Sequence, residues 1–279
     1  MSDAPTIGAI ERVVVWLDSA SENRAAIGTA VRLAAHAKAP LHGVFVEDEE
    51  LLHLASLPFA RQFTLGAGAE PLTIEQIELH LRVAAEQARR ELCAAAERHG
   101  VKCSFEILRT ASGSAVVGAS ERDLVVAGGL TRPVGGHFRV ECRCWSQIEV
   151  TPGAFLVVRQ SEVAGGDVVM LLADRDPTSV RLLDAAAQVA ASGGSGLTVI
   201  CPPALAGAAG FDAWLAERLA QHPVRLQVEV GPDEPVALDR RIGELHCRLL
   251  AVGAGFAEAA GDGLRKFADR FACDLLVVR

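Results

Sequence analysis

The sequence has 279 residues, half of them apolar, which suffices for two domains of about 140 residues that each bury a core. The formal net charge is −8, aromatic residues make up 5% and Lys and Arg form no cluster, so we expect no binding of nucleic acid or of anionic membranes. No apolar stretch reaches the roughly 20 residues of a membrane-spanning helix, and no basic segment precedes an apolar one at the N-terminus, so we expect a cytoplasmic protein.

The first half begins with a strand, a helix and a second strand. Residues 12–18 form a short apolar run that ends at Asp18. Its continuous apolarity predicts a strand that is buried on both faces of a parallel sheet. Ser19 and Glu22 have the spacing of a capping box, which predicts the start of a helix. A second buried strand is predicted at residues 41–46.

A leucine-rich segment, residues 47–71, follows and has no counterpart in the second half. After it, Thr73 and Gln76 predict the capped start of a long helix, and Gly100 predicts its end. Three further strands of the first half are predicted at residues 103–108, 123–129 and 154–159.

The second half repeats this order in a shorter form. Residues 167–174 are an apolar run that ends at Asp174. Asp176 and Pro177 have the sequence of an N-cap and a first helical residue, and Gly194 is typical of a helix end. The remaining strands are predicted at residues 197–201, 226–230, 248–253 and 274–279.

Two series of five strands with helices between them predict an α/β protein of two tandem, doubly wound, five-stranded parallel sheets with helices on both faces. We place the first domain at residues 10–160 and a second, smaller and more divergent domain at residues 166–279. A lone five-stranded domain would expose its last strand as an edge. We therefore expect residues 154–158 and 274–278 to pair antiparallel about a pseudo-two-fold axis, as a dimer within one chain. A homodimer of the whole chain stays open.

The strand that ends in Asp, the capped helix and the strand that ends in Val-Phe-Val-Glu-Asp resemble the universal stress protein family. The Leu-Val-Val-Arg end of each half resembles it too, so the likeness spans nearly the whole chain as two copies. It implies a stress-response or regulatory protein that acts by binding a ligand or partner. Some members of the family bind ATP, others do not, and a defined reaction is generally lacking.

The nucleotide signature of that family is a Gly, two residues, a Gly, nine residues, then Gly-Ser or Gly-Thr. The resemblance places Gly128 at the first glycine, Thr131 at the second, Glu141 at the third and Cys142 at the Ser. A carboxylate repels a phosphate, and a Cβ keeps the backbone away from it. The departures predict that this loop does not bind ATP in the canonical way.

The nucleoside end of the same pocket departs less from the family. The resemblance places Asp18, Val44 and Val46 there, so an adenine nucleoside or nucleotide stays open as a cofactor, although Asp18 also fits a helix-capping role. In the second half, Gly253 takes the place of the first glycine and Asp262 that of the Ser.

No spacing typical of a catalytic or metal site stands out, so we expect neither catalytic residues nor a metal, and a non-enzymatic protein is the main hypothesis. One alternative is an enzyme that binds a nucleoside or another small molecule in the pocket of Asp18 and Gly128. The other is a thiol redox sensor that uses Cys142 and Cys144, two of seven scattered cysteines without a CxxC motif.

Overall fold

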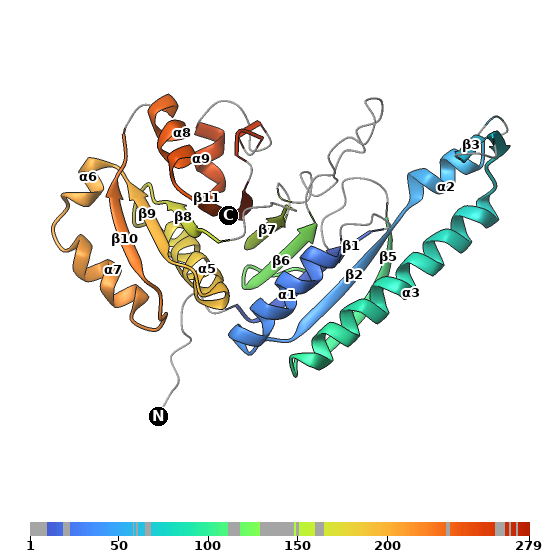
Figure 1. Ribbon diagram of the computed structural model, residues 1–279, viewed down its shortest axis with the longest axis horizontal. Coiled ribbons are helices and arrows are strands. Elements are labelled where there is room, and N and C mark those ends of the chain that lie inside the picture. The colour runs from blue at the N-terminus through green and yellow to red at the C-terminus, as the bar shows by residue number, and fades with distance from the viewer. Residues whose placement is uncertain are drawn as a thin grey trace.

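The computed structural model describes residues 10–18, 23–57, 59, 61–64, 68–110, 118–128, 148, 151–159, 165–232, 235–259, 266–267, 269–271 and 273–279. Its main feature is a 10-stranded sheet in the order β10-β9-β8-β11-β12-β7-β6-β1-β2-β5 (Figure 1). The first half of the chain supplies five neighbouring strands and the second half the other five. The predicted α/β class is confirmed, with the two five-stranded sheets joined edge to edge.

The first half contains β1 (Arg12–Leu17), α1 (Asn23–Ala37), β2 (Leu41–Asp48), α3 (Ile74–Arg98), β5 (Cys103–Thr110), β6 (Asp123–Gly128) and β7 (Ala154–Val158). Its strands lie in the order β5-β2-β1-β6-β7, and every neighbouring pair is parallel. The leucine-rich segment forms α2 (Glu49–Ala55) and a separate antiparallel pair, β3 (Arg61–Thr64) and β4 (Gly68–Pro71). This pair and the start of α3 extend away from the main sheet as an arm (Figure 1).

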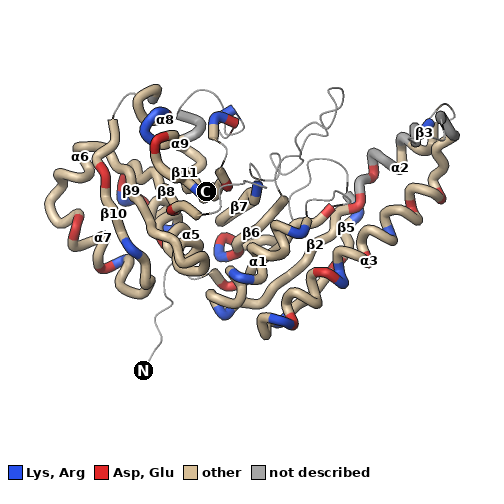
Figure 2. Tube along the Cα trace, viewed as in Figure 1, with Lys and Arg blue, Asp and Glu red and all other residues tan. Residues whose placement is uncertain are grey.

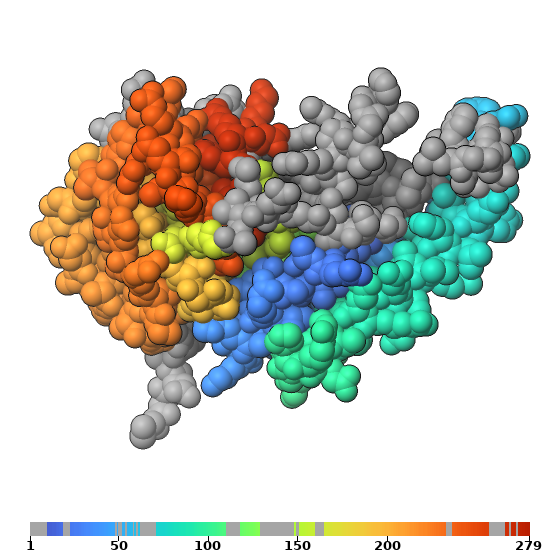
Figure 3. Space-filling view, viewed as in Figure 1, coloured from blue at the N-terminus to red at the C-terminus, as the bar shows by residue number. Residues whose placement is uncertain are grey.

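The second half contains β8 (Asp167–Leu171), α5 (Pro177–Gly193), β9 (Leu197–Cys201), α6 (Pro203–Ala206), α7 (Phe211–Leu219), β10 (Leu226–Val230), α8 (Pro235–Glu244), β11 (Cys247–Gly253), α9 (Ala254–Ala259) and β12 (Asp274–Val278). Its strands lie in the order β10-β9-β8-β11-β12, again all parallel. This order mirrors that of the first half, as the internal repeat predicts. The two halves lie side by side in Figure 3.

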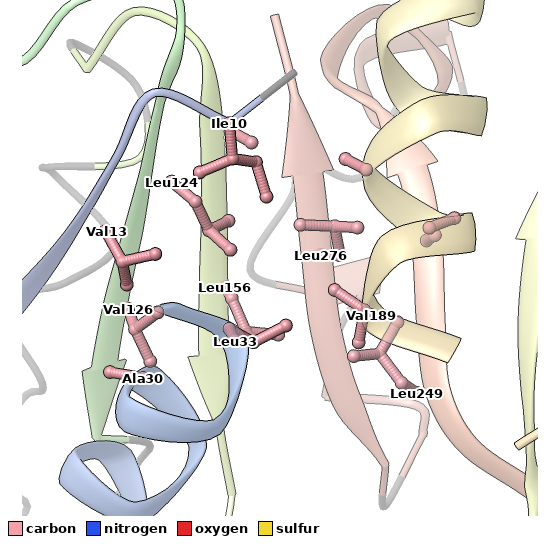
Figure 4. Packing of buried hydrophobic residues seen from close by; sticks show 14 of the residues in the cluster. Ile10, Val13, Ala30, Leu33, Leu124, Val126, Leu156, Val189, Leu249 and Leu276 are labelled. Atoms are coloured by element: carbon pink, nitrogen blue, oxygen red, sulfur yellow. The ribbon is translucent and has the colours of Figure 1, made fainter. Parts of the chain in front are cut away.

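The two halves meet where β7 and β12 pair antiparallel, which confirms the predicted pairing. Leu156 lies opposite Leu276, and Ala154 lies opposite Val278. Each leucine is the middle residue of its strand, so a pseudo-two-fold axis passes between them. Leu33 of α1 and Val189 of α5 lie on the same side of this joint (Figure 4).

The sheet is buried on both faces because its strands carry apolar side chains at successive positions. In β1, Val13 and Val15 pack in the core cluster with residues of α1, α3, α5 and α7, whereas Val14 and Trp16 pack in the cluster on the other face. Ile242 of α8 belongs to that second cluster, and α9 packs against it. The continuous apolar runs therefore mark strands between two layers, as predicted.

The helix ends follow the predicted caps where the structure describes them. Thr73 and Gln76 form the reciprocal capping box of α3. The Asp176 side chain accepts a hydrogen bond from the Ser179 N–H at 2.6 Å, and Gly194 ends α5 at a φ of 64°, in the left-handed region. Ser19 and Glu22 lie outside the described residues.

Acidic and basic residues are both spread along α3 (Figure 2). Glu86 accepts hydrogen bonds from Arg89 and Arg90, both at 2.8 Å, and these bonds lower the pKa of Glu86 to about 2. Glu86 and Arg90 have the i,i+4 spacing that stabilises helices. In the described part of the chain, no helix combines the length and the apolar composition that a bilayer crossing needs.

Candidate functional site

A cavity of about 300 Å³ opens in the second half, at the carboxyl ends of β8, β9 and β10. This is the edge at which doubly wound sheets place their ligands. Its described lining residues, most of them apolar, are Leu171, Leu172, Ala173, Ile200, Cys201, Pro202, Gly231, Pro232, Leu238, Asp239, Phe256, Phe267 and Arg270. The volume is at the small end of the range for ligand pockets.

The ends of β9 and β10 supply part of the cavity lining. The Gly231 N–H, just after β10, donates to the Cys201 carbonyl at 2.8 Å. A Cβ on Gly231 would lie 2.5 Å from Cγ2 of Ile200, so a glycine is needed here for close approach. Burial raises the pKa of the Cys201 thiol, which therefore stays protonated near neutral pH.

Two aromatic rings, those of Phe256 and Phe267, form one wall of the cavity. Phe256, on α9, packs edge-on against Phe267 with ring centroids 5.9 Å apart, and Phe267 packs in the same way against Phe271 at 5.3 Å. Phe267 is fully buried. Edge-to-face packing of this kind fixes ring positions. The wall therefore offers a firm apolar surface to a ligand.

The charged groups at the cavity neutralise each other. Among its described lining residues the charged ones are Asp239 and Arg270, whose Oδ2 and Nη1 atoms lie 2.9 Å apart. Both side chains are about one-third exposed, so the pair lies where solvent reaches it. Within the described residues, no group of three or more His, Cys, Asp and Glu side chains is placed to hold a metal ion. The arrangement suits binding of a mainly apolar molecule with a polar end.

The structure brings part of the sequence-predicted site together in the first half. Asp18 directly follows β1 and is exposed, and Gly128 ends the neighbouring strand β6. Val44 and Val46 lie in β2, on the other side of β1, and both are buried. The carboxyl ends of these three strands thus meet at one edge of the sheet. The Asp18 carbonyl accepts a hydrogen bond from the Asn23 side-chain amide at 2.6 Å.

The predicted phosphate loop is not described. Thr131, Glu141 and Cys142 lie outside the described residues, as does Cys144. The interpretation of this loop as unsuited to ATP stays a prediction, and so does the thiol pair at residues 142 and 144.

Comparisons with known proteins give a match at the level of structure. No family model matches the sequence, and no curated protein matches it. A universal stress protein from Archaeoglobus fulgidus superposes with a TM-score of 0.59 at 11% identity, over 95% of this chain and 96% of its own. The chain has the universal stress protein fold.

Two proteins from Pseudomonas aeruginosa share this universal stress protein fold across nearly the whole chain. One, of unknown function, has a TM-score of 0.57 at 15% identity and covers 99% of this chain and 94% of its own. The other is described as a universal stress protein and has a TM-score of 0.53 at 15% identity. The match covers 98% of this chain and 94% of that protein. At identities this low, the structural likeness establishes the fold alone. The function has to be inferred from the site.

Asp174 ends the second predicted apolar run, three residues after the end of β8, and its carboxylate lies in the turn before α5. It accepts hydrogen bonds from the Asp176 N–H at 3.0 Å and from the Ser179 hydroxyl at 2.8 Å, and these bonds lower its pKa. Asp174 is not among the described residues that line the cavity. Asp174 therefore stabilises the turn that leads into α5, whose N-cap is Asp176.

Proposed function

We propose that this is a cytoplasmic stress-response or regulatory protein of the universal stress protein type that acts by binding a ligand or a partner, without catalysis. Its ligand site is the cavity of the second half. One observation carries the proposal: the cavity lies at the carboxyl edge of the sheet, has two edge-packed aromatic rings in its wall, and bears an ion pair that neutralises itself. A site of this kind can hold a molecule, and the acid and the base among its described lining residues, Asp239 and Arg270, are paired with each other.

The ligand class follows from the cavity's size and charge. A small molecule with a flat apolar part fits against Phe256, and a single polar end meets Asp239 and Arg270. A triphosphate does not suit the site, because the Asp239–Arg270 pair leaves no net positive charge among the described lining residues to offset the charge of the phosphates. ATP binding is therefore weak or absent, and ATP binds no better than adenosine.

The pocket at Asp18, Val44, Val46 and Gly128 is a second candidate site for an adenine nucleoside. The meeting of three strand ends at this edge supports it. Its phosphate end would involve Thr131, Glu141 and Cys142, whose residue types disfavour a nucleotide.

Two measurements test the proposal. Mass spectrometry of small molecules released from the purified protein should identify a bound compound. Calorimetric titration with adenosine, AMP, ATP and Mg-ATP should then rank the nucleoside above the triphosphate. Micromolar binding of ATP that exceeds that of adenosine would contradict the proposed ligand class.

A matched pair of substitutions tests whether the ligand binds in this cavity. Ala173 lines the cavity and is exposed, so Ala173→Phe should fill the space without disturbing the core and weaken ligand binding at least about tenfold. Ala220 is exposed at the end of α7, outside the described lining, so Ala220→Phe should leave binding unchanged. Binding that survives Ala173→Phe but is lost in Asp18→Asn would move the site to the first half.

A further inference from the structure

Two cysteines lie in contact next to the joint between the two halves. The Sγ atoms of Cys247 and Cys273 are 3.6 Å apart, although the residues are 26 positions apart in the sequence. Cys247 begins β11, and Cys273 directly precedes β12, the parallel neighbour of β11. Both lie at the amino end of their strands, because Leu249 is opposite Asp274 at the start of the ladder. Neighbouring strands are about 4.8 Å apart, within the range that a disulfide spans.

Three described residues from the chain between the two cysteines line one wall of the cavity. Phe256 lies on α9, which directly follows β11, and Phe267 and Arg270 come shortly before Cys273. A bond between the two sulfurs would close this whole segment into a ring.

The surroundings favour a thiolate on Cys273. The Cys247 thiol donates a hydrogen bond to the Cys273 sulfur. Arg159 is held next to it, because its Nη1 donates to the Phe271 carbonyl at 2.5 Å and its backbone N–H donates to the Asp274 carboxylate at 2.7 Å. The Cys247 hydrogen bond and the Arg159 charge lower the pKa of Cys273 against the opposing effects of burial and of the Asp274 carboxylate, whereas the same hydrogen bond raises the pKa of Cys247.

We propose that Cys247 and Cys273 are a redox modification site: a peroxide converts the pair into a reversible disulfide that ties together both ends of the aromatic wall of the cavity. Cys273 is buried, but Cys247 is partly exposed, which leaves the pair open to a molecule as small as hydrogen peroxide. This site is distinct from the predicted sensor at Cys142 and Cys144.

The reaction proceeds in two steps. The Cys273 thiolate attacks one oxygen of hydrogen peroxide, the O–O bond breaks, and hydroxide leaves a sulfenic acid on Cys273. The Cys247 sulfur then attacks the Cys273 sulfur, the S–O bond breaks, and water leaves with the Cys247 proton. The hydroxide takes up the proton that Cys273 had released, so one peroxide and two thiols give a disulfide and two waters. A dithiol reductant reverses the change.

Trypsin digestion of the full chain tests the bond directly. Cleavage after Arg241, Arg248 and Arg270 releases Cys247 in the peptide IGELHCR and Cys273 in the peptide FACDLLVVR. After treatment with stoichiometric hydrogen peroxide at pH 7, mass spectrometry should find these two peptides joined, and separate again after dithiothreitol. A full complement of alkylatable thiols at both positions, or overoxidation of Cys273 without a cross-link, would overturn the proposal.

Stability gives a second readout that does not depend on any ligand. Closing a ring of this length should raise the melting temperature of the oxidised full chain by roughly 5 °C. Cys247→Ser and Cys273→Ser should each abolish the rise, whereas Cys201→Ser, a buried cysteine on β9, should keep it. If the two Ser variants fold poorly, the mass of the cross-linked peptides from the unaltered chain still shows whether the disulfide forms. A rise in melting temperature that persists in both Ser variants would show that another thiol pair is responsible.

An effect of the disulfide on ligand binding in the cavity rests on the proposed function, whereas formation of the disulfide does not. Hydrogen exchange in α9 should slow in the oxidised form, because both ends of its segment are anchored. The affinity for adenosine should then differ between the reduced and oxidised forms. A cross-link with unchanged exchange and affinity would uphold the modification site and overturn its link to the cavity.

Discussion

At the scale of single residues, Asp184 is a carboxylate that the fold buries without neutralising it. It lies on α5, is 5% exposed, and its Oδ2 atom has no hydrogen-bond partner among the described residues. Burial raises its pKa to about 6, although the charge of Arg218 acts in the opposite direction. From its ordinary value of 3.8 up to about 6, the unfolded chain loses this proton while the folded chain keeps it. Stability therefore falls as the pH rises through that range.

Asp184→Asn should remove this loss. At pH 7.5 we expect the variant to be more stable than the unaltered protein by about 1–3 kcal/mol, and the difference should shrink at pH 5. Urea denaturation at both pH values measures it. Asp212→Asn, which changes an exposed carboxylate on α7, should show no such dependence. Burial also raises the pKa of Asp274 to about 6. The stability of the variant should therefore still fall somewhat as the pH rises. Equal stabilisation of Asp184→Asn at both pH values would contradict this account.

Residue-level contacts are also where the sequence is least informative. Asp18 could be placed at a strand end because it terminates an apolar run. The contact between Cys247 and Cys273 could not be predicted in this way, since it depends on the register of two strands 26 positions apart. The signal was present nonetheless: each cysteine lies two residues before the apolar core of its strand, and the two strands are neighbours in the sheet.

At the scale of elements, two capped helices differ in what surrounds them. The start of α3 is solvated: Leu79 and Val83 are 59% and 58% exposed. In contrast, α5 is buried along most of its length and packs against β8, β11 and β12. A helix in solvent can fray by itself, whereas a packed helix unfolds with the domain.

Removal of the two caps should therefore have different effects. Asp176→Ala should cost about 1–2 kcal/mol of global stability, because it removes the 2.6 Å bond to the Ser179 N–H. Thr73→Ala should leave the melting temperature nearly unchanged and speed hydrogen exchange in the first turns of α3. Thermal melting and amide exchange of both variants give the comparison. Equal losses of melting temperature would mean that the arm is part of the cooperative core.

Elements were predictable from the sequence where a strand is buried on both faces of the sheet, because such a strand carries a continuous apolar run. The strands β1, β6 and β12 are of this kind. The cavity was not predictable, because its wall comes from short segments around Phe256 and Phe267 whose approach depends on tertiary packing. The resemblance directed attention to the first half, and the structure shows the cavity in the second.

At the scale of the whole molecule, the chain forms a dimer within itself. The antiparallel pairing of β7 with β12 turns two exposed edges into the centre of one sheet. This feature was predictable, since each half ends in a short apolar strand that needs a partner. Leu156 and Leu276 face each other at its centre, so either strand could in principle pair with a second copy of itself.

The isolated first half, residues 10–160, should therefore fold and associate into a dimer through β7. Its unpaired edge would meet the same edge of a second copy, with Leu156 opposite Leu156, because the antiparallel register is symmetric about that residue. Sedimentation equilibrium should give twice the fragment mass. The matched control carries residues 274–279 after a flexible linker, which supplies β12 to the same edge and should keep the fragment monomeric. A folded monomer without the added strand, or a dimer that persists with it, would show that association uses another surface.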